Sequence, residues 1–171
     1  SPVRSALAFS MARSRAIARN ARWLWTTSMP SRADYREEAE QYLIPDLRKM
    51  NEIAKQAGAK FAVASFACPD IYNLPYLERA WFRGQFFFNQ QPRTEFDDYA
   101  LAAEGFNEAC RKFCESESAL YIPVAENLKG GIALYVDITH MHIPGMKKKA
   151  QIIADNLKSP ILESLKNLAQ P

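Results

Sequence analysis

The spacing of apolar and polar residues predicts four helical segments. In each segment apolar residues recur every three to four positions, and polar or charged residues fill the positions between them. The segments are residues 5–24, residues 35–57 with Ser31 as a suitable N-cap, residues 96–116, and residues 144–157. Pro45 should kink or divide the second helix, and Ser159-Pro160 should end the last one, because proline lacks the N–H that continues a helix. Residues 160–168 would then form a separate helical turn.

Two short stretches are apolar almost without interruption. They are "KFAVASF" at residues 60–66 and "ALYIPV" at residues 119–124, and both read as buried strands. Strands that alternate with helices predict an α/β fold, with a parallel sheet covered by helices. Two parallel strands make a poor core by themselves, so we expect polypeptide from elsewhere to cover one edge of the first strand. The chain should therefore associate with another segment or with another copy of itself.

Charge is unevenly distributed along the 171 residues, whose net charge is +3. Residues 1–33 contain six arginines and no acidic residue, whereas the remainder contains sixteen Lys and Arg against nineteen Asp and Glu. We interpret residues 1–30 as an Arg-rich helical segment that packs on the rest of the protein with its arginines turned outward. Contact with a membrane surface is the less favoured alternative. No nucleic-acid partner is expected, because no recognition motif accompanies the charge.

The three cysteines, Cys68, Cys110 and Cys114, are interpreted as small apolar packing residues. A disulfide between Cys110 and Cys114 would have poor geometry, because the two lie four residues apart on one predicted helix. No further Cys or His residues stand at zinc-ligand spacing. The sequence therefore predicts neither a metal site nor a cofactor, and it indicates no particular cellular compartment.

Residues 70–96 contain eight aromatic residues without a clear period. One interpretation is a lid or cleft wall for acyl chains or sugar rings, in which Arg79 or Arg83 meets an anionic group of the substrate. The other is an ordered excursion whose aromatic side chains fill a secondary core. The sequence does not decide between the two interpretations.

An aspartate and a histidine stand three residues apart in "VDITHMHIPGMKKKAQIIADNL", on a turn just before the last helix. A carboxylate on one imidazole nitrogen fixes the tautomer, so that the other nitrogen can take a proton from a hydroxyl nucleophile. Asp137 and His140 are therefore the candidate catalytic residues, with Asp137 Oδ expected to bind His140 Nδ1 and Nε2 to face a cleft beside residues 70–96. Pro144 suits a first helical turn, and Gly145 permits a tight approach of the backbone. His142 is interpreted as a surface or loop-capping residue.

The same stretch resembles the last conserved block of the SGNH hydrolases, the GDSL-type esterases and lipases. Their pattern of Asp-x-x-His, a glycine after four residues, and an early helical alanine is matched by Asp137, His140, Gly145 and Ala150. Residues 35–69 and 99–126 resemble the helices and strands that precede this block. The resemblance implies a three-layer, doubly wound, flavodoxin-like parallel sheet, of which residues 31–171 supply the C-terminal strands and helices. It also implies that His140 is the general base and that Asp137 orients it.

The chain departs from the family in lacking a nucleophile block. It contains no Gly-Asp-Ser, no Gly-x-Ser-x-Gly and no Gly-x-Asn-Asp sequence. We therefore predict the C-terminal portion of a serine esterase that acts on an acetylated sugar, a lipid or a small ester. Its serine would come from the N-terminal half of the same enzyme or from a partner chain. The alternative is a non-catalytic binding module, whose contact surfaces are the aromatic segment and the Arg-rich N-terminus.

Overall fold

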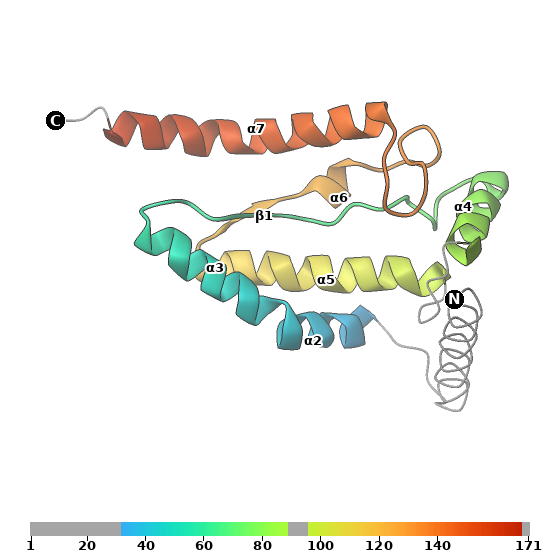
Figure 1. Cartoon of the computed structure of the whole chain (residues 1–171), viewed down its shortest axis with the longest axis horizontal. Coiled ribbons are helices and arrows are strands. Elements are labelled where there is room, and N and C mark those ends of the chain that lie inside the picture. The colour runs from blue at the N-terminus through green and yellow to red at the C-terminus, as the bar shows by residue number, and fades with distance from the viewer. Residues whose placement is uncertain (1–31, 89–95, 169–171) are drawn as a thin grey trace, which may run out of the picture.

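The computed structural model describes residues 32–88 and 96–168, and these residues form a mixed α/β fold (Figure 1). In chain order the elements are α2 (Arg32–Tyr42), α3 (Ile44–Gln56), β1 (Ala62–Ala64), α4 (Tyr76–Phe88), α5 (Phe96–Glu117), β2 (Leu120–Ile122), α6 (Val124–Asn127) and α7 (Ile143–Leu168). The predicted helix at residues 5–24, the Arg-rich segment and the Ser31 cap lie outside the described residues.

The two predicted strands pair with each other in parallel. Ala62 is opposite Leu120 and Ala64 is opposite Ile122. Both strands are shorter than predicted, and together they form the whole sheet within residues 32–88 and 96–168. The α/β class predicted from the sequence is thus confirmed in its general form, and the larger doubly wound sheet goes beyond what these residues contain.

Helices lie on both faces of this small sheet (Figure 1). On one face, α7 contributes Ile152, Ile153 and Leu157 to a core that includes Ile122 of β2. On the other face, α2, α3 and α5 pack around a second core that contains Phe113 and the flanks of the strands. The strands therefore lie between two apolar layers. The loops at the ends of the strands are the places where functional side chains can lie close together.

Two prolines behave differently from each other. Pro45 lies in the first turn of α3, and the predicted helix is divided there, as expected. The predicted break at Ser159-Pro160 is wrong, because α7 continues through Pro160 to Leu168. Proline removes a single backbone hydrogen bond, and the residues beyond it again have helical spacing and good helix propensity. The Ser164 hydroxyl also donates a hydrogen bond to the Pro160 carbonyl oxygen at 2.9 Å.

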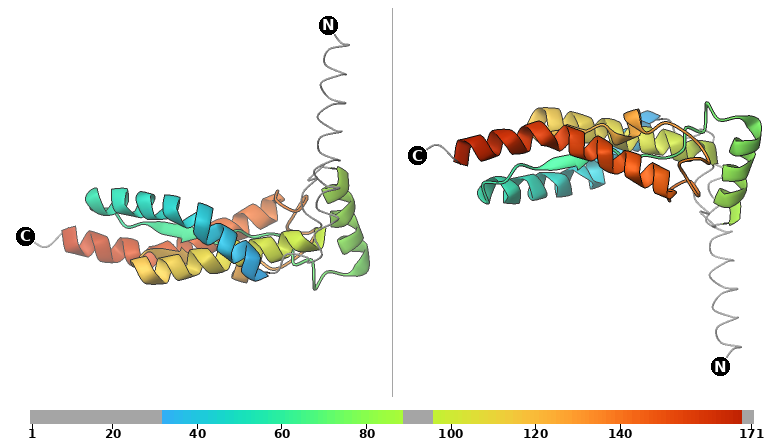
Figure 2. Two further views of the ribbon diagram at one scale, coloured as in Figure 1. Left: turned by 90° about the horizontal axis from the view of Figure 1, so that it is seen from below. Right: turned by 90° about the horizontal axis from the view of Figure 1, so that it is seen from above.

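The aromatic segment is more regular than its sequence suggested. Its second half forms helix α4, which stands at one end of the sheet (Figures 1 and 2). Phe82 and Phe86, one helical turn apart, are buried in the core, whereas Tyr76 and Trp81 are exposed. The period was hidden because aromatic residues occupy both faces of the helix. The burial of Phe82 and Phe86 on the inner face of α4 agrees with the core-filling interpretation. Residues 89–95 lie outside the described part of the chain.

The three cysteines are not joined in disulfides. Cys68, Cys110 and Cys114 are free, and the last two are buried among the packed helices. This position matches their predicted role as packing residues. Among the helices described here, none is long and apolar enough to cross a lipid bilayer.

Candidate active site

The loop between α6 and α7 presents the candidate residues, and two buried side chains hold it in place. Tyr135 is completely buried, and its hydroxyl donates a hydrogen bond to the Leu128 carbonyl oxygen at 3.1 Å. Ile138 is also buried in the main core. The backbone of Tyr135 forms a bridge with Met141, which closes the loop into a narrow turn. The residues between these anchors, including Asp137 and His140, are therefore held at the surface in a defined conformation.

Asp137 and His140 form the hydrogen bond that their spacing predicted. Asp137 Oδ2 lies 2.7 Å from His140 Nδ1. The other carboxylate oxygen, Oδ1, accepts the backbone N–H groups of Thr139 at 2.8 Å and of His140 at 2.7 Å. An aspartate that binds the backbone two or three residues further on closes a local turn. The same carboxylate therefore builds the turn and holds the imidazole.

The contacts around Nδ1 determine which imidazole nitrogen carries the proton in the neutral ring. An ionised carboxylate only accepts hydrogen bonds, so Nδ1 must donate its N–H to Asp137. The Thr139 hydroxyl lies 3.1 Å from Asp137 Oδ1 and 3.1 Å from His140 Nδ1, where it can donate to the first and accept from the second. The lone pair of the neutral imidazole is then on Nε2. No hydrogen bond to Nε2 is found within the described part of the chain.

The pKa of the Asp137 carboxyl shows how strongly the turn holds it in the charged form. Partial burial alone would raise this pKa, but the hydrogen bonds from His140 and Thr139 outweigh burial and lower it from 3.8 to about 2. The Asp137 side chain is 14% exposed, whereas that of His140 is 78% exposed. Asp137 is therefore ionised at any pH near neutrality, as a residue that orients a base requires.

This depressed pKa predicts a specific loss of stability in acid. Asp137 binds protons more weakly in the folded chain than in the unfolded chain, so its contribution is complete above pH 4 and is lost as the pH falls through about 2. We expect a contribution of at most about 2 kcal/mol to the free energy of unfolding. Urea unfolding of the wild-type chain and of Asp137→Asn, between pH 5 and pH 2, measures it as the difference between the two curves.

The comparison with Asp137→Asn is needed because other carboxyls titrate in the same range. A hydrogen bond from Lys112 lowers the pKa of Glu108, and one from Lys60 lowers the pKa of Glu163. Both groups are present in both proteins, so their effects cancel in the difference. Curves that stay parallel across this pH range would show that the carboxylate is not held as described.

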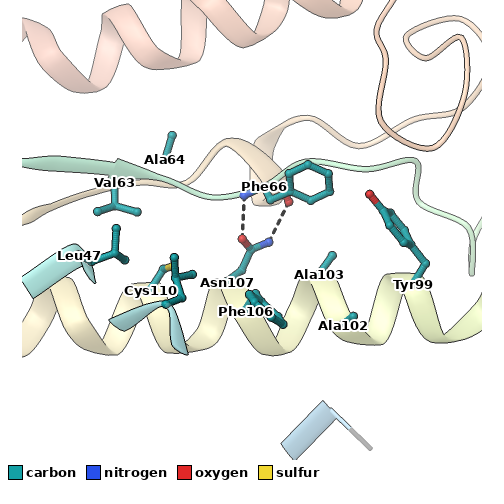
Figure 3. A pocket seen from close by; sticks show the side chains of 11 residues that line it. Leu47, Val63, Ala64, Phe66, Tyr99, Ala102, Ala103, Phe106, Asn107 and Cys110 are labelled. Carbon is teal, nitrogen blue, oxygen red and sulfur yellow. Dashed lines mark hydrogen bonds between the residues drawn. The ribbon is translucent and has the colours of Figure 1, made fainter. Parts of the chain in front are cut away.

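Neither of the two pockets described in residues 32–88 and 96–168 includes Asp137 or His140 in its lining. The imidazole is open to solvent, and the larger described pocket is lined by residues of α3, β1 and α5 and their flanks rather than by Asp137, His140 or residues 70–96 (Figure 3). Two arginines of residues 70–96, for which binding of an anionic substrate group was one interpretation, are each paired with an aspartate. Arg79 and Arg83 both pair with Asp97, at 2.8 Å and 3.3 Å. Neither arginine is therefore a free anion-binding group.

Tyr99, which the sequence did not single out as a site residue, packs against the main core that also contains Ile138 of the candidate loop. Burial raises the pKa of Tyr99 to about 12, with smaller electrostatic contributions from Cys68 and Asp137. Its ring also packs edge-on against Phe66, just after β1. Tyr99 comes from α5, and no local pattern relates it to the loop that carries Ile138, so only the tertiary fold could reveal this shared core.

His142 and the acidic groups complete the description of the site. The His142 side chain is exposed, and its backbone carbonyl oxygen accepts the N–H of Met146 in the first turn of α7. This position agrees with the surface and loop-capping interpretation. Within residues 32–88 and 96–168, no group of three or more His, Cys, Asp or Glu side chains is arranged to hold a metal ion.

Comparison with known proteins does not assign the chain to a family. No protein-family model, no curated protein and no solved structure matches it.

Proposed function

We propose that this chain supplies the general base and its orienting carboxylate to an SGNH-type serine esterase. The observation that carries the proposal is the 2.7 Å hydrogen bond between Asp137 Oδ2 and His140 Nδ1, with Oδ1 fixed by two backbone N–H groups. This arrangement leaves Nε2 as a proton acceptor at the protein surface. The serine nucleophile and the oxyanion-hole donors come from outside these 171 residues.

In the proposed reaction, Nε2 of His140 takes the proton of the serine hydroxyl as its oxygen attacks the ester carbonyl carbon. Asp137 stabilises the imidazolium that results. The imidazolium then protonates the departing alkoxide, which leaves an acyl-enzyme. His140 next takes a proton from the water that attacks the acyl carbon, and the imidazolium gives this proton to the serine oxygen as the acyl–serine bond breaks and the acid leaves. The substrate class is a carboxylic ester, with an acetylated sugar, a lipid or a small ester as candidates.

The arrangement of elements supports this proposal at the level of fold class. Two parallel strands with helices on both faces are compatible with part of a doubly wound α/β sheet. In the proposal, further strands extend this sheet into a three-layer domain. The candidate residues follow β2 and α6 in the chain, on a loop of the kind that carries catalytic groups in α/β proteins.

A non-catalytic binding module is the second candidate function. It is favoured by two observations, namely the solvent-exposed side chain of His140 and an open apolar groove beside β1. In that case the Asp137–His140 hydrogen bond stabilises the loop and performs no chemistry. The two functions differ in whether a hydroxyl group ever meets Nε2.

The chain by itself should show no turnover of short acyl esters. We expect hydrolysis of p-nitrophenyl acetate at the same rate for the wild-type chain and for His140→Ala, apart from the weak reaction of any exposed imidazole. The reason is that the chain contains none of the family's nucleophile or oxyanion-hole sequences. Saturable turnover that His140→Ala abolishes would contradict a nucleophile outside the chain.

The decisive experiment is to read the coding sequence upstream of Ser1 and to express the extended protein. A Gly-Asp-Ser block, together with an ester hydrolysis that requires His140, would support the esterase. An extended protein without such a block and without ester hydrolysis would leave the binding module as the better function.

A further inference from the structure

The hydroxyl of Thr139 is a third polar group at the Asp137–His140 pair. The backbone N–H of Thr139 donates to Asp137 Oδ1 at 2.8 Å, which holds the residue in the turn. Its hydroxyl oxygen lies 3.1 Å from the same Oδ1 atom and 3.1 Å from His140 Nδ1. Threonine is β-branched, so few χ1 angles are open to it. The hydroxyl therefore has a defined position although Thr139 lies at the surface.

The two oxygens of the Asp137 carboxylate have different partners. Oδ1 accepts the N–H groups of Thr139 and His140 and lies within reach of the Thr139 hydroxyl. Oδ2 binds His140 Nδ1 at 2.7 Å. Because the turn holds Oδ1, the other oxygen faces the ring. The Thr139 hydroxyl thus supplies one of the hydrogen bonds that fix the direction of the carboxylate.

The same hydroxyl also acts on the ring. The His140 side chain is exposed, so packing does little to orient the imidazole, and the contacts that hold it are those at Nδ1. When the Thr139 hydroxyl donates to Oδ1, its lone pairs face Nδ1 and accept the N–H there together with Asp137. A ring with its proton on Nε2 would instead bring a lone pair against these oxygens. The hydroxyl therefore favours the tautomer that a general base needs.

We propose that Thr139 is a positioning residue for the general base, whose hydroxyl holds the Asp137 carboxylate and the Nδ1–H of His140 so that Nε2 keeps its lone pair. The part of this role that concerns catalysis rests on the proposed esterase function. The oxygen of the hydroxyl also faces Nδ1 when the ring is protonated, so it helps Asp137 to stabilise the imidazolium.

A threonine that only closes the turn is the alternative. Serine and threonine hydroxyls in turns commonly bind backbone groups nearby. Here the backbone N–H of Thr139 makes the turn contact, whereas the hydroxyl contacts the side chains of the two candidate residues. The two roles belong to different atoms, so substitution of the side chain separates them.

The first test uses ¹⁵N chemical shifts of the imidazoles in the full chain, at about pH 8.5, where histidine side chains are neutral. The chain has two histidines, and His142→Ala identifies their signals. We expect His140 to carry its proton on Nδ1. Thr139→Val keeps the shape and the backbone N–H but removes the hydroxyl, so the ratio of the Nδ1–H to the Nε2–H tautomer should fall about fivefold, which corresponds to about 1 kcal/mol.

Thr139→Ser is the matched control, because it keeps the hydroxyl. Its tautomer ratio should lie within about twofold of the wild-type ratio, and the His142 signals should not change in either variant. Urea unfolding checks that both variants are folded. An unchanged ratio in Thr139→Val would overturn the positioning role, and so would equal losses in Thr139→Val and Thr139→Ser, which would assign the effect to the turn.

The second test uses the extended protein that carries the nucleophile. Thr139→Val should lower kcat for p-nitrophenyl acetate by about fivefold and leave KM within about twofold, and Thr139→Ser should restore kcat. If His140→Ala abolishes hydrolysis but Thr139→Val leaves kcat unchanged, the positioning role is wrong and the esterase stands. If the tautomer ratio responds as expected but the extended protein hydrolyses no ester, Thr139 does position the ring and the esterase is wrong.

Discussion

Replacing His140 with alanine is expected to lower kcat for ester hydrolysis by about 10⁴- to 10⁶-fold in the extended protein that carries the nucleophile. The loss is large because the serine hydroxyl then has no base to take its proton, and the alkoxide has no acid to protonate it. Asp137→Asn should cost about 10²-fold less, since an amide can still contact the ring but no longer fixes the tautomer or stabilises the imidazolium. Steady-state kinetics with p-nitrophenyl acetate measures both effects.

His142 is the matched control for this experiment. It lies two residues further on, and its side chain is exposed and makes none of the contacts of the Asp137 turn. His142→Ala should therefore leave kcat within about twofold of the wild-type value, because surface changes of this kind are usually near neutral. Equal losses in His140→Ala and His142→Ala would show that the two alanine variants act through the fold of the loop rather than through chemistry.

Replacing Gly145 with alanine is expected to destabilise the chain by about 1–3 kcal/mol and to displace the Asp137–His140 turn. A Cβ atom at Gly145 would collide with the carbonyl oxygen of Leu134, and it would also lie 3.3 Å from the Met141 side chain. The collision partner is backbone, so no side-chain rotation relieves it. Urea unfolding measures the loss, and the imidazole ¹⁵N chemical shifts of His140 report whether Nδ1 still donates to Asp137.

Gly84 provides the control for the glycine change. It lies in α4, and a Cβ built there meets no atom within 4 Å. Gly84→Ala should therefore stabilise the chain by about 0.5–1 kcal/mol, because alanine favours the helix and restricts the unfolded chain. A Gly145→Ala variant as stable as Gly84→Ala would refute the close approach of α7 to the candidate loop.

The role of Gly145 in a close backbone approach was thus predictable from the sequence, but the group that it approaches was not. Sequence suggested that Gly145 allows a tight approach, whereas the structure identifies the Leu134 carbonyl as the group approached. The aromatic segment shows the opposite case. Its helix was missed because Tyr76 and Trp81 on the outer face are as aromatic as Phe82 on the inner face. Hydrophobic periodicity fails as a signal when both faces of a helix carry apolar side chains.

The break predicted at Pro160 illustrates a further limit. The local rule is sound, because proline does lose a helical hydrogen bond, but the cost is finite and helical residues on both sides outweigh it. Interactions across the fold also act on this part of α7, including the exposed ion pair of 2.8 Å between Lys60 and Glu163. Such an ion pair is weak by itself, and its existence could not be read from residues more than one hundred positions apart.

The sequence by itself determined the alternation of the main helices with the two strands, the division at Pro45, and the pairing of Asp137 with His140. These features follow from contacts within a few residues, and an aspartate three residues before a histidine closes its turn with local hydrogen bonds. Only the tertiary structure decided that His140 is exposed, that Tyr99 packs against the core that contains Ile138, and that Asn107 pairs with Phe66 beside β1. Asn107 and Phe66 are 41 residues apart in the chain, and their contact exists because α5 packs against β1. Packing of that kind depends on every element at once, so no local pattern of residues encodes it.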